Sequence, residues 1–448
     1  MKRKLILSAV MMATAQMALA EGNSQRLMDI YLQAQAADST WASAKSAHAA
    51  IQEKLVQGKA LTLPTVTFNA NAEHSNTDVF YKGSSANPFS GGTQSFGTYA
   101  YSVNVNHPLY HKQNNVQYEQ AQTQVAQADD VLNAARLDLM VRTASAYFEV
   151  LLAQDKIDLL VAQKAATVRQ LEQAKANFDV GTATITDVHE AQAKFDLLIA
   201  QEIAAMNDLE IRLRSIQAIT GQVPTKLASA KEKLDVVIPQ PQSMESWVEI
   251  AEQQSPQLKI QQQAVQLANQ EIERTHAGHL PTVDLVANFS DTSSSGGTNG
   301  IGSDLQNFTF GVKLEIPLYQ GGSISSKERE AVGNQQKAQD DLELARRTAD
   351  LNTRQAYLNV ASAVAQVKAY EQALVSSLSS LDSTSLGYEV GVRTSVDVLN
   401  AQQQYYSAKR DLLQARYTWM ISVIKLKGAA GVLSDNDLAE TSSMLESL

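Results

Sequence analysis

Cysteine is absent from all 448 residues of the chain. This absence excludes disulfides, thiolate metal sites and a lipid anchor on an N-terminal cysteine. Beyond the first 20 residues there is also no run of 18 or more apolar residues, the length that marks a transmembrane helix. If any part of the chain crosses a membrane, strands must form that part, because in lipid only helices and closed sheets satisfy the backbone.

The motifs of enzymes and of cofactor-binding proteins are missing as well. The sequence has no nucleophile elbow, no glycine-rich phosphate loop and no pair of carboxylates in a pocket context. Its seven histidines show no ligand spacing, and His189 stands at the start of an expected helix. We therefore expect no enzyme activity, no cofactor and no metal site.

The N-terminus indicates export. A basic start from Lys2 to Lys4 is followed by an apolar run and by the ending Ala18-Leu19-Ala20, the pattern of a cleavable signal peptide over residues 1–20. Cleavage before Glu21 removes three basic and no acidic residues, so the formal net charge falls from -10 to -13. So acidic a chain is a poor partner for nucleic acid, and none is expected.

The rest of the sequence is internally duplicated. The segment from Phe178 to Val188 recurs from Tyr388 to Val398, shifted by 210 positions. A repeat of this length is a whole structural unit. The predicted division is a signal peptide (1–20), a first repeat (21–223), a linker (224–242), a second repeat (243–432) and a C-terminal tail (433–448).

Long helices are expected in both repeats. From Lys112 to Val180 there is no glycine and no proline, and apolar residues recur in steps of three and four, as in a coiled coil. The matching stretch of the second repeat runs from about Ser323 to Leu386 and contains Gly333. Shorter helices are expected at about 24–59, 185–219, 244–276 and 395–426.

Each repeat also contains a β-hairpin, at about 62–108 and 280–317, in which apolar and polar residues alternate. The prolines at both ends, among them Pro108, are expected to stop the strand pairing. Strands of about 9–11 residues with this pattern have the length that crosses an outer membrane in a barrel. Tyr110 and Tyr319 fit either an aromatic belt at the membrane surface or a buried ring at a bend.

Four strands are too few to close a barrel. Two copies of the chain would give eight strands and a filled interior, whereas three copies would give twelve and leave a channel. The alternative is a pair of soluble hairpins that cap a helical rod, with their apolar faces packed on each other.

The hairpins between Leu-Pro-Thr-Val and Pro-Leu-Tyr, and the long helices ending in Val-Gly-x-x-Thr-x-x-Asp-Val, resemble the TolC family of outer-membrane channel proteins over nearly the whole chain. The resemblance implies the α+β fold class: a long α-helical coiled-coil barrel continued by a trimeric twelve-stranded transmembrane β-barrel, with four strands from each chain. It also implies that the linker 224–242 and the tail 433–448 form an equatorial belt in the periplasm.

The function implied by the resemblance is passive exit for drugs, small molecules and secreted proteins across the outer membrane. The expected partners are two further copies in a homotrimer, outer-membrane lipid, a periplasmic adaptor (membrane fusion) protein, and an inner-membrane efflux pump or ABC exporter. These proteins would open the channel at its periplasmic end. The alternative is a non-conducting structural coiled-coil protein of the cell envelope.

The repeated turn that follows each long helix has a structural explanation. Gly181 and Gly391 suit the left-handed residue that closes a helix. The Thr and Asp that follow, three residues apart, match a capping box. The same turns can have a function in addition to this structural role.

The resemblance assigns further roles to residues of these turns. It implies a gate network (Thr186, Asp187, Tyr388 and Arg393), an acidic ring at the entrance (Asp397), a second ring position (Asn400) and adaptor-docking residues (Val180, Gly181, Val390 and Gly391). Charge-assisted hydrogen bonds of about 1.5–3 kcal/mol each would form a lock that a partner can undo. Because Asn400 is neutral, we expect weaker block by multivalent cations than in a channel with two acidic rings.

Overall fold

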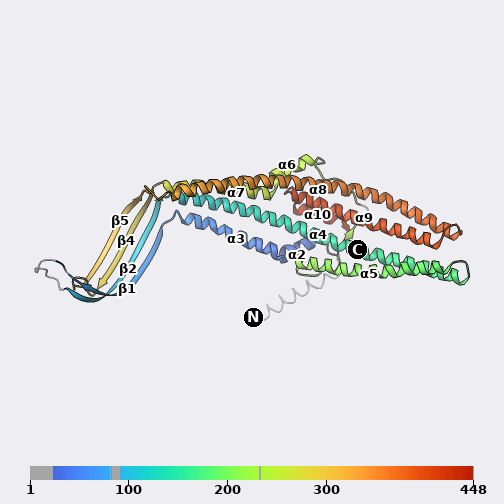
Figure 1. Cartoon of the computed structure of the whole chain (residues 1–448), viewed down its shortest axis with the longest axis horizontal. Coiled ribbons are helices and arrows are strands. Elements are labelled where there is room, and N and C mark those ends of the chain that lie inside the picture. Colours follow the sequence, from blue (N-terminus) through green and yellow to red (C-terminus); the bar gives the residue numbers. More distant parts are fainter. Residues whose placement is uncertain (1–23, 81, 83–90, 232–233, 447–448) are drawn as a thin grey trace, which may run out of the picture. The chain divides into compact units, whose positions relative to one another are not determined.

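The computed structural model describes residues 24–80, 82, 91–231 and 234–446 (Figure 1). The predicted signal peptide, residues 1–20, lies outside the described residues. The chain divides into two compact units. The strand-containing unit comprises Ala47–Asp130 and Ile260–Glu343, and the helical unit comprises the residues up to Ser46, Val131–Lys259 and the residues from Leu344.

Four antiparallel strands form one sheet in the order β1-β2-β4-β5. The strands are β1 (Thr65–Val79), β2 (Gly92–Tyr110), β4 (Thr282–Ser294) and β5 (Ser303–Glu315). Their register places Phe68, Val103, Phe289 and Phe308 in one row across all four strands. The predicted alternation therefore produces one apolar face, while the other face is polar and carries a hydrogen bond from Asn288 Nδ2 to Asn104 Oδ1 of 2.6 Å.

Two details of the predicted hairpins are wrong. The strands have 15, 19, 13 and 13 residues rather than 9–11. In addition, Pro108 does not end the pairing, because β2 continues to Tyr110 with a register shift between Pro108 and Tyr110. A bulge is a place where a strand tolerates a residue without an N–H.

The two hairpins join edge to edge, because β2 pairs with β4. This pairing contradicts the alternative of two hairpins packed face to face. Apolar side chains of the outer strands remain open to solvent, with Phe68 67% and Phe308 70% exposed. Tyr110 and Tyr319 are 43% and 88% exposed, so neither is the buried ring considered above.

Two predicted helices are each broken into two. The first gives α2 (Leu27–Ala37) and α3 (Ser39–Ala60), and the matching segment of the second repeat gives α6 (Met244–Gln254) and α7 (Pro256–His276). Asp38 accepts a hydrogen bond from Trp41 N at 2.7 Å and thereby caps α3. At the matching position, Ser255 precedes Pro256, and a residue before proline disfavours the helical conformation.

The long helices are present as predicted, and Gly333 does not interrupt the second. They are α4 (Lys112–Asp179, 68 residues) and α8 (Ser323–Glu389, 67 residues), each about 100 Å long at 1.5 Å per residue. They are followed by α5 (Ile185–Thr220) and α9 (Ser395–Ala429), and the short 3-10 helix η1 (Ala277–His279) follows α7. No helix in the described part of the chain combines the length and the hydropathy that a membrane crossing requires.

The core of the helical unit anchors the linker and the tail. Tyr147 is fully buried and its hydroxyl donates to Ala228 O at 2.9 Å. Its counterpart in the second repeat, Tyr357, donates to Gln242 O at 2.5 Å. Beside them, β3 (Ser229–Ala230) pairs with β6 (Leu445–Glu446), which follows α10 (Asp435–Ser443). The linker and the tail are thus parts of one packed structure.

Candidate functional site

The candidate site consists of the two turns that end the long helices, one between α4 and α5 and one between α8 and α9. Gly181 and Gly391 have φ angles of 75° and 81°. A Cβ at either glycine would meet nothing within 4 Å, so the backbone conformation and not space requires glycine. In each turn an N–H just beyond the glycine returns to the last helical turn, from Thr182 to Asn177 O at 2.8 Å and from Val392 to Gly387 O at 2.9 Å.

Both turns contain the predicted capping box. In the first, Asp187 Oδ2 accepts from the N–H of Thr184 at 2.9 Å, and Thr184 Oγ1 accepts from the N–H of Asp187 at 3.3 Å. In the second, the corresponding distances between Thr394 and Asp397 are 2.9 and 3.2 Å. The N–H and the hydroxyl of Thr394, with Arg393 nearby, hold the pKa of Asp397 below its usual value. The carboxylate is therefore ionised and is also committed to the helix start.

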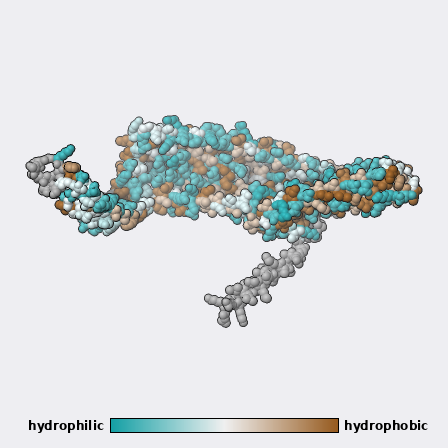
Figure 2. All heavy atoms as spheres, turned by 60° about the horizontal axis from the view of Figure 1, so that its bottom comes forward, coloured by the Kyte–Doolittle hydropathy of each residue, from teal (hydrophilic) through white to brown (hydrophobic). Residues whose placement is uncertain are grey.

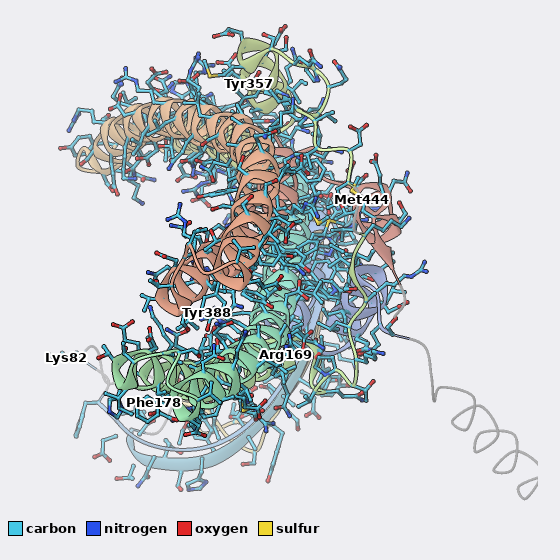
Figure 3. The ribbon with its side chains drawn as sticks, turned by 90° about the vertical axis from the view of Figure 1, so that its right-hand side faces the viewer. Lys82, Arg169, Phe178, Tyr357, Tyr388 and Met444 are labelled. Atoms are coloured by element: carbon cyan, nitrogen blue, oxygen red, sulfur yellow. The ribbon has the colours of Figure 1, made fainter. Side chains whose placement is uncertain are left out.

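Tyr388 joins the two turns of the chain. Its hydroxyl accepts a hydrogen bond from Asn177 Nδ2 at 3.0 Å, and Figure 3 shows Tyr388 on the side of α8 that faces the α4–α5 pair carrying Phe178. Within the described residues no hydrogen bond joins Tyr388 to Thr186 or Asp187. Asn177 was not among the residues predicted from the sequence, although the sequence does show that its counterpart in the second repeat is a glycine, Gly387.

Arg393 occupies space that Gly387 leaves open. A Cβ on Gly387 would lie 2.8 Å from Arg393 Cγ, too close for the arginine to keep its place. In the first repeat the same two positions hold Asn177 and Ala183. The second repeat therefore presents an exposed cation at its turn where the first presents none.

The two helical pairs also pack on each other above the turns. Leu171 of α4, Ala191 of α5 and Leu399 of α9 form a small buried cluster. Beside it, Gln170 Nε2 donates to Ser395 Oγ at 3.3 Å. This contact is small, so few interactions hold the two pairs together at this end of the unit.

Asn400 lines a cavity of about 250 Å³ together with Glu190. Glu190 occupies the position in the first repeat that Asn400 occupies in the second. The neutral Asn400 predicted a lost charge, whereas Glu190, which was not predicted, places one carboxylate beside it. Lys194 lines the same cavity.

The residues expected to dock an adaptor are exposed. Val180 and Val390 are 73% and 66% exposed, and Val392 is 75% exposed. Figure 2 shows hydrophobic residues gathered at the end of the helical unit that carries these turns. Glycines flanked by exposed valines leave backbone and apolar surface open to a partner.

No group of three or more potential ligand side chains suited to a metal ion occurs among the residues that the structure describes.

Comparisons with known proteins bear on the family and the fold of the chain. Residues 30–222 and 247–432 match the family described as outer membrane efflux protein. The outer membrane protein TolC of Vibrio cholerae is 34% identical over 425 residues, which cover 94% of this chain and 94% of that protein. The proteases secretion protein PrtF of Dickeya chrysanthemi is 28% identical over 452 residues, which cover 100% of this chain and 96% of that protein.

Among solved structures, the outer membrane protein VceC of Vibrio cholerae superposes with a TM-score of 0.74 at 19% identity. The superposition covers 90% of this chain and 96% of that chain. The two chains therefore share a fold.

Proposed function

This chain belongs to the outer membrane efflux protein family, and we propose that three copies of it form a channel for the passive exit of drugs, other small molecules and secreted proteins. The family consists of channels and not of enzymes. Its members lie in the outer membrane, and this chain does too. The single observation that supports assembly into a trimer is the four-stranded sheet. Its outer strands β1 and β5 have no partner strand among the described residues.

The sheet has the chemistry of a barrel segment. Along β4 the apolar band of this sheet extends from Val283 to Phe289. Its length is about 20 Å at 3.3 Å per residue, close to the height of the apolar band of an outer-membrane barrel. On the neighbouring edge strand, Phe310 and Val312 are 65% and 62% exposed. Lipid would cover this face, while water in the lumen would cover the polar face. Pairing of β1 with β5 of another copy would remove both edges, and three copies give the twelve strands that leave a channel.

The helical unit also has an apolar seam that one chain leaves uncovered. Leu344, Leu351 and Leu358 follow each other at seven-residue spacing on α8 and are 64%, 63% and 58% exposed. This is the spacing of a coiled-coil seam. A helix of a neighbouring copy would cover this seam and continue the wall into a closed ring of helices. The seam therefore supports the same trimer as the sheet does.

We further propose that the two turns form the periplasmic entrance. In this proposal Tyr388, Arg393, Thr186 and Asp187 contribute to a closed gate within and between copies, with Asn177 as an additional member. Asp397 supplies an acidic ring, and Val180, Gly181, Val390 and Gly391 dock the adaptor. The small contact between the helical pairs supports this proposal, because a weakly held end is one that a partner can open.

A TolC-type channel in efflux or secretion works with a pump and an adaptor. PrtF is named for the secretion of proteases, which supports protein export as one activity of this channel. We propose a periplasmic adaptor (membrane fusion) protein with an inner-membrane efflux pump or ABC exporter. The proposed organisation is two repeats, 21–223 and 243–432, joined by an equatorial belt of residues 224–242 and 433–448.

The test begins with the full chain expressed in a bacterium that lacks its own channel of this family. We expect detergent to extract it from outer membranes as a trimer that dissociates on heating. The purified trimer is then inserted in planar lipid bilayers, where stepwise single-channel currents are expected. A water-soluble rod without conductance would instead establish the structural envelope protein.

A further inference from the structure

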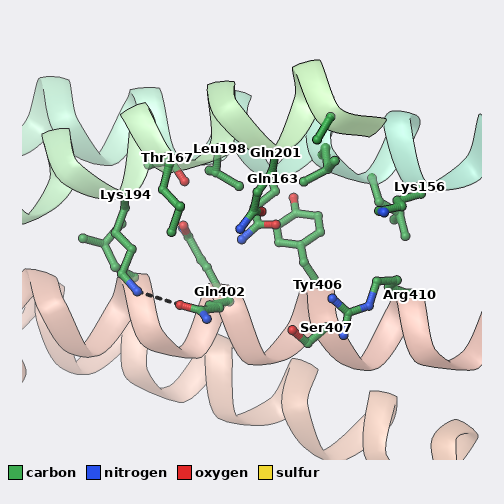
Figure 4. Close-up of a pocket in the computed structure, with 16 residues that line it drawn as sticks. Lys156, Gln163, Thr167, Lys194, Leu198, Gln201, Gln402, Tyr406, Ser407 and Arg410 are labelled. Carbon is green, nitrogen blue, oxygen red and sulfur yellow. Dashed lines mark hydrogen bonds between the residues drawn. The ribbon is translucent and has the colours of Figure 1, made fainter. Parts of the chain in front are cut away.

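A cavity between α4, α5 and α9 lies outside the turns that form the proposed entrance. Its volume is about 340 Å³, within the range of small-molecule sites. Figure 4 shows Lys156 and Arg410 at one end of it and Lys194 at the other, with Tyr406 between them. The cavity therefore takes its charged side chains from three helices.

All charged residues that line the cavity are basic. Lys156, Lys194 and Arg410 contribute to its wall and no acidic residue does, although the chain has 47 acidic and only 37 basic residues. Lys156 makes no ion pair and no hydrogen bond within the described residues. Lys194 donates to Gln403 Oε1 at 2.7 Å, a neutral partner, and Glu190 lies with it in the neighbouring cavity. A wall that carries cationic donors and no carboxylate favours an anion over a cation.

Acidic residues near the Lys156 end are already paired. Glu149 and Asp208 line the adjoining cavity, and Arg212 contacts them at 2.7 and 3.3 Å. Arg410 donates to Asp411 at 2.8 Å, but this leaves other guanidinium N–H groups available because arginine has five. Together, Glu149, Asp208 and Asp411 balance the charges of Arg212, Lys156 and Arg410, so this end offers an anion N–H donors rather than an excess of positive charge.

The rest of the wall suits an organic molecule with an apolar body. Leu160 and Leu198 are buried beneath it, with 9% and 5% exposure. Burial raises the pKa of Tyr406, so its hydroxyl stays protonated and can donate. Gln402 Oε1 is buried without a hydrogen-bond partner. Rotation of this amide by a half turn would offer its NH₂ group to an anion.

We infer that this cavity binds a small organic anion, an aromatic or aliphatic sulfonate or carboxylate, with its charged group between Lys156 and Arg410. The apolar body lies on the leucines. The inference rests on the proposed channel function, since it makes the cavity a transient site for anionic cargo. The acidic side chain of a neighbouring copy or of a partner protein is the competing occupant that the experiment must exclude.

The experiment is calorimetric titration of the detergent-purified trimer with 2-naphthalenesulfonate and with its neutral analogue naphthalene-2-sulfonamide. We expect saturable binding of the sulfonate that weakens as salt is raised, and binding of the neutral analogue that is at least about twofold weaker. The double variant Lys156→Gln/Arg410→Gln should lose a similar factor. The matched control Lys175→Gln/Lys425→Gln removes two exposed cations outside the cavity and should bind as the parent does.

Equal binding of the two ligands, or equal binding by the parent and the cavity variant, overturns the inference. So does a crystal structure of the trimer in which an acidic side chain of another copy fills the cavity. The single-channel conductance of the same preparation is recorded in parallel. A conducting trimer that does not bind the sulfonate refutes the anion site alone, whereas a preparation that does not conduct refutes the channel function.

Discussion

The hydrogen bond between Asn177 and Tyr388 gives a direct test of the proposed gate. Tyr388→Phe removes the hydroxyl that accepts from Asn177 Nδ2 at 3.0 Å, and both side chains are half-buried. A hydrogen bond of this kind contributes about 0.5–1.5 kcal/mol net. In a trimer three such bonds give about 1.5–4.5 kcal/mol. Since about 1.4 kcal/mol is a factor of ten, the open population should rise by at least about tenfold.

Single-channel recording in planar bilayers measures this change as open probability and mean conductance. Asn177→Ala should have the same effect, and the double variant should exceed neither single variant by much, because both remove one interaction. The control is Tyr405→Phe, since the Tyr405 hydroxyl makes no hydrogen bond within the described residues. Additive effects of the two gate variants, or unchanged conductance in both, would refute the role given to this bond. Adding Arg393→Ser to Tyr388→Phe should raise permeability further.

Three further predictions concern the membrane face, the entrance and stability. Phe310 pairs with Ala287 near the middle of the apolar band, so Phe310→Lys should abolish outer-membrane assembly at a cost of about 2–4 kcal/mol per copy. Asn307→Lys on the polar face should still assemble, and the yields of heat-sensitive trimer compare the two variants. Asn400→Asp should strengthen block by cobalt hexammine and Glu190→Gln should weaken it; unchanged block in both would show that this cavity lies away from the ion path. Burial raises the pKa of Asp155, and its bond from Tyr417 only partly offsets this. A raised folded-state pKa favours folding below about pH 4, where the unfolded state is protonated too, and this contribution is lost as pH rises through the folded-state value. Asp155→Asn should therefore flatten the pH dependence of thermal melting over that range, and equal slopes would contradict the argument.

The sequence by itself determined the features that depend on near neighbours. The capping boxes join residues three positions apart, and the left-handed glycines follow directly on their helices. The long helices need only a run of residues that favour helix, and the strands only alternation. The duplication then placed equivalent elements in both repeats. Each of these depends on interactions within a few residues, which a sequence displays directly.

Tertiary structure decided what distant segments bring together. The break at Asp38 is fixed by Trp41 nearby, but also by Arg142, whose guanidinium donates to it at 3.0 and 3.2 Å from 104 positions away. Asn177 meets Tyr388 across 211 positions.

Glu190 shares a cavity with Asn400, and three helices assemble the basic cavity around Lys156. No local sequence pattern predicts these contacts, because they depend on which faces of the long helices pack against each other. The pairing of β2 with β4 could not be predicted from the sequence either. The alternation of residues shows which face of a strand is apolar, but packing decides which strand lies next to it.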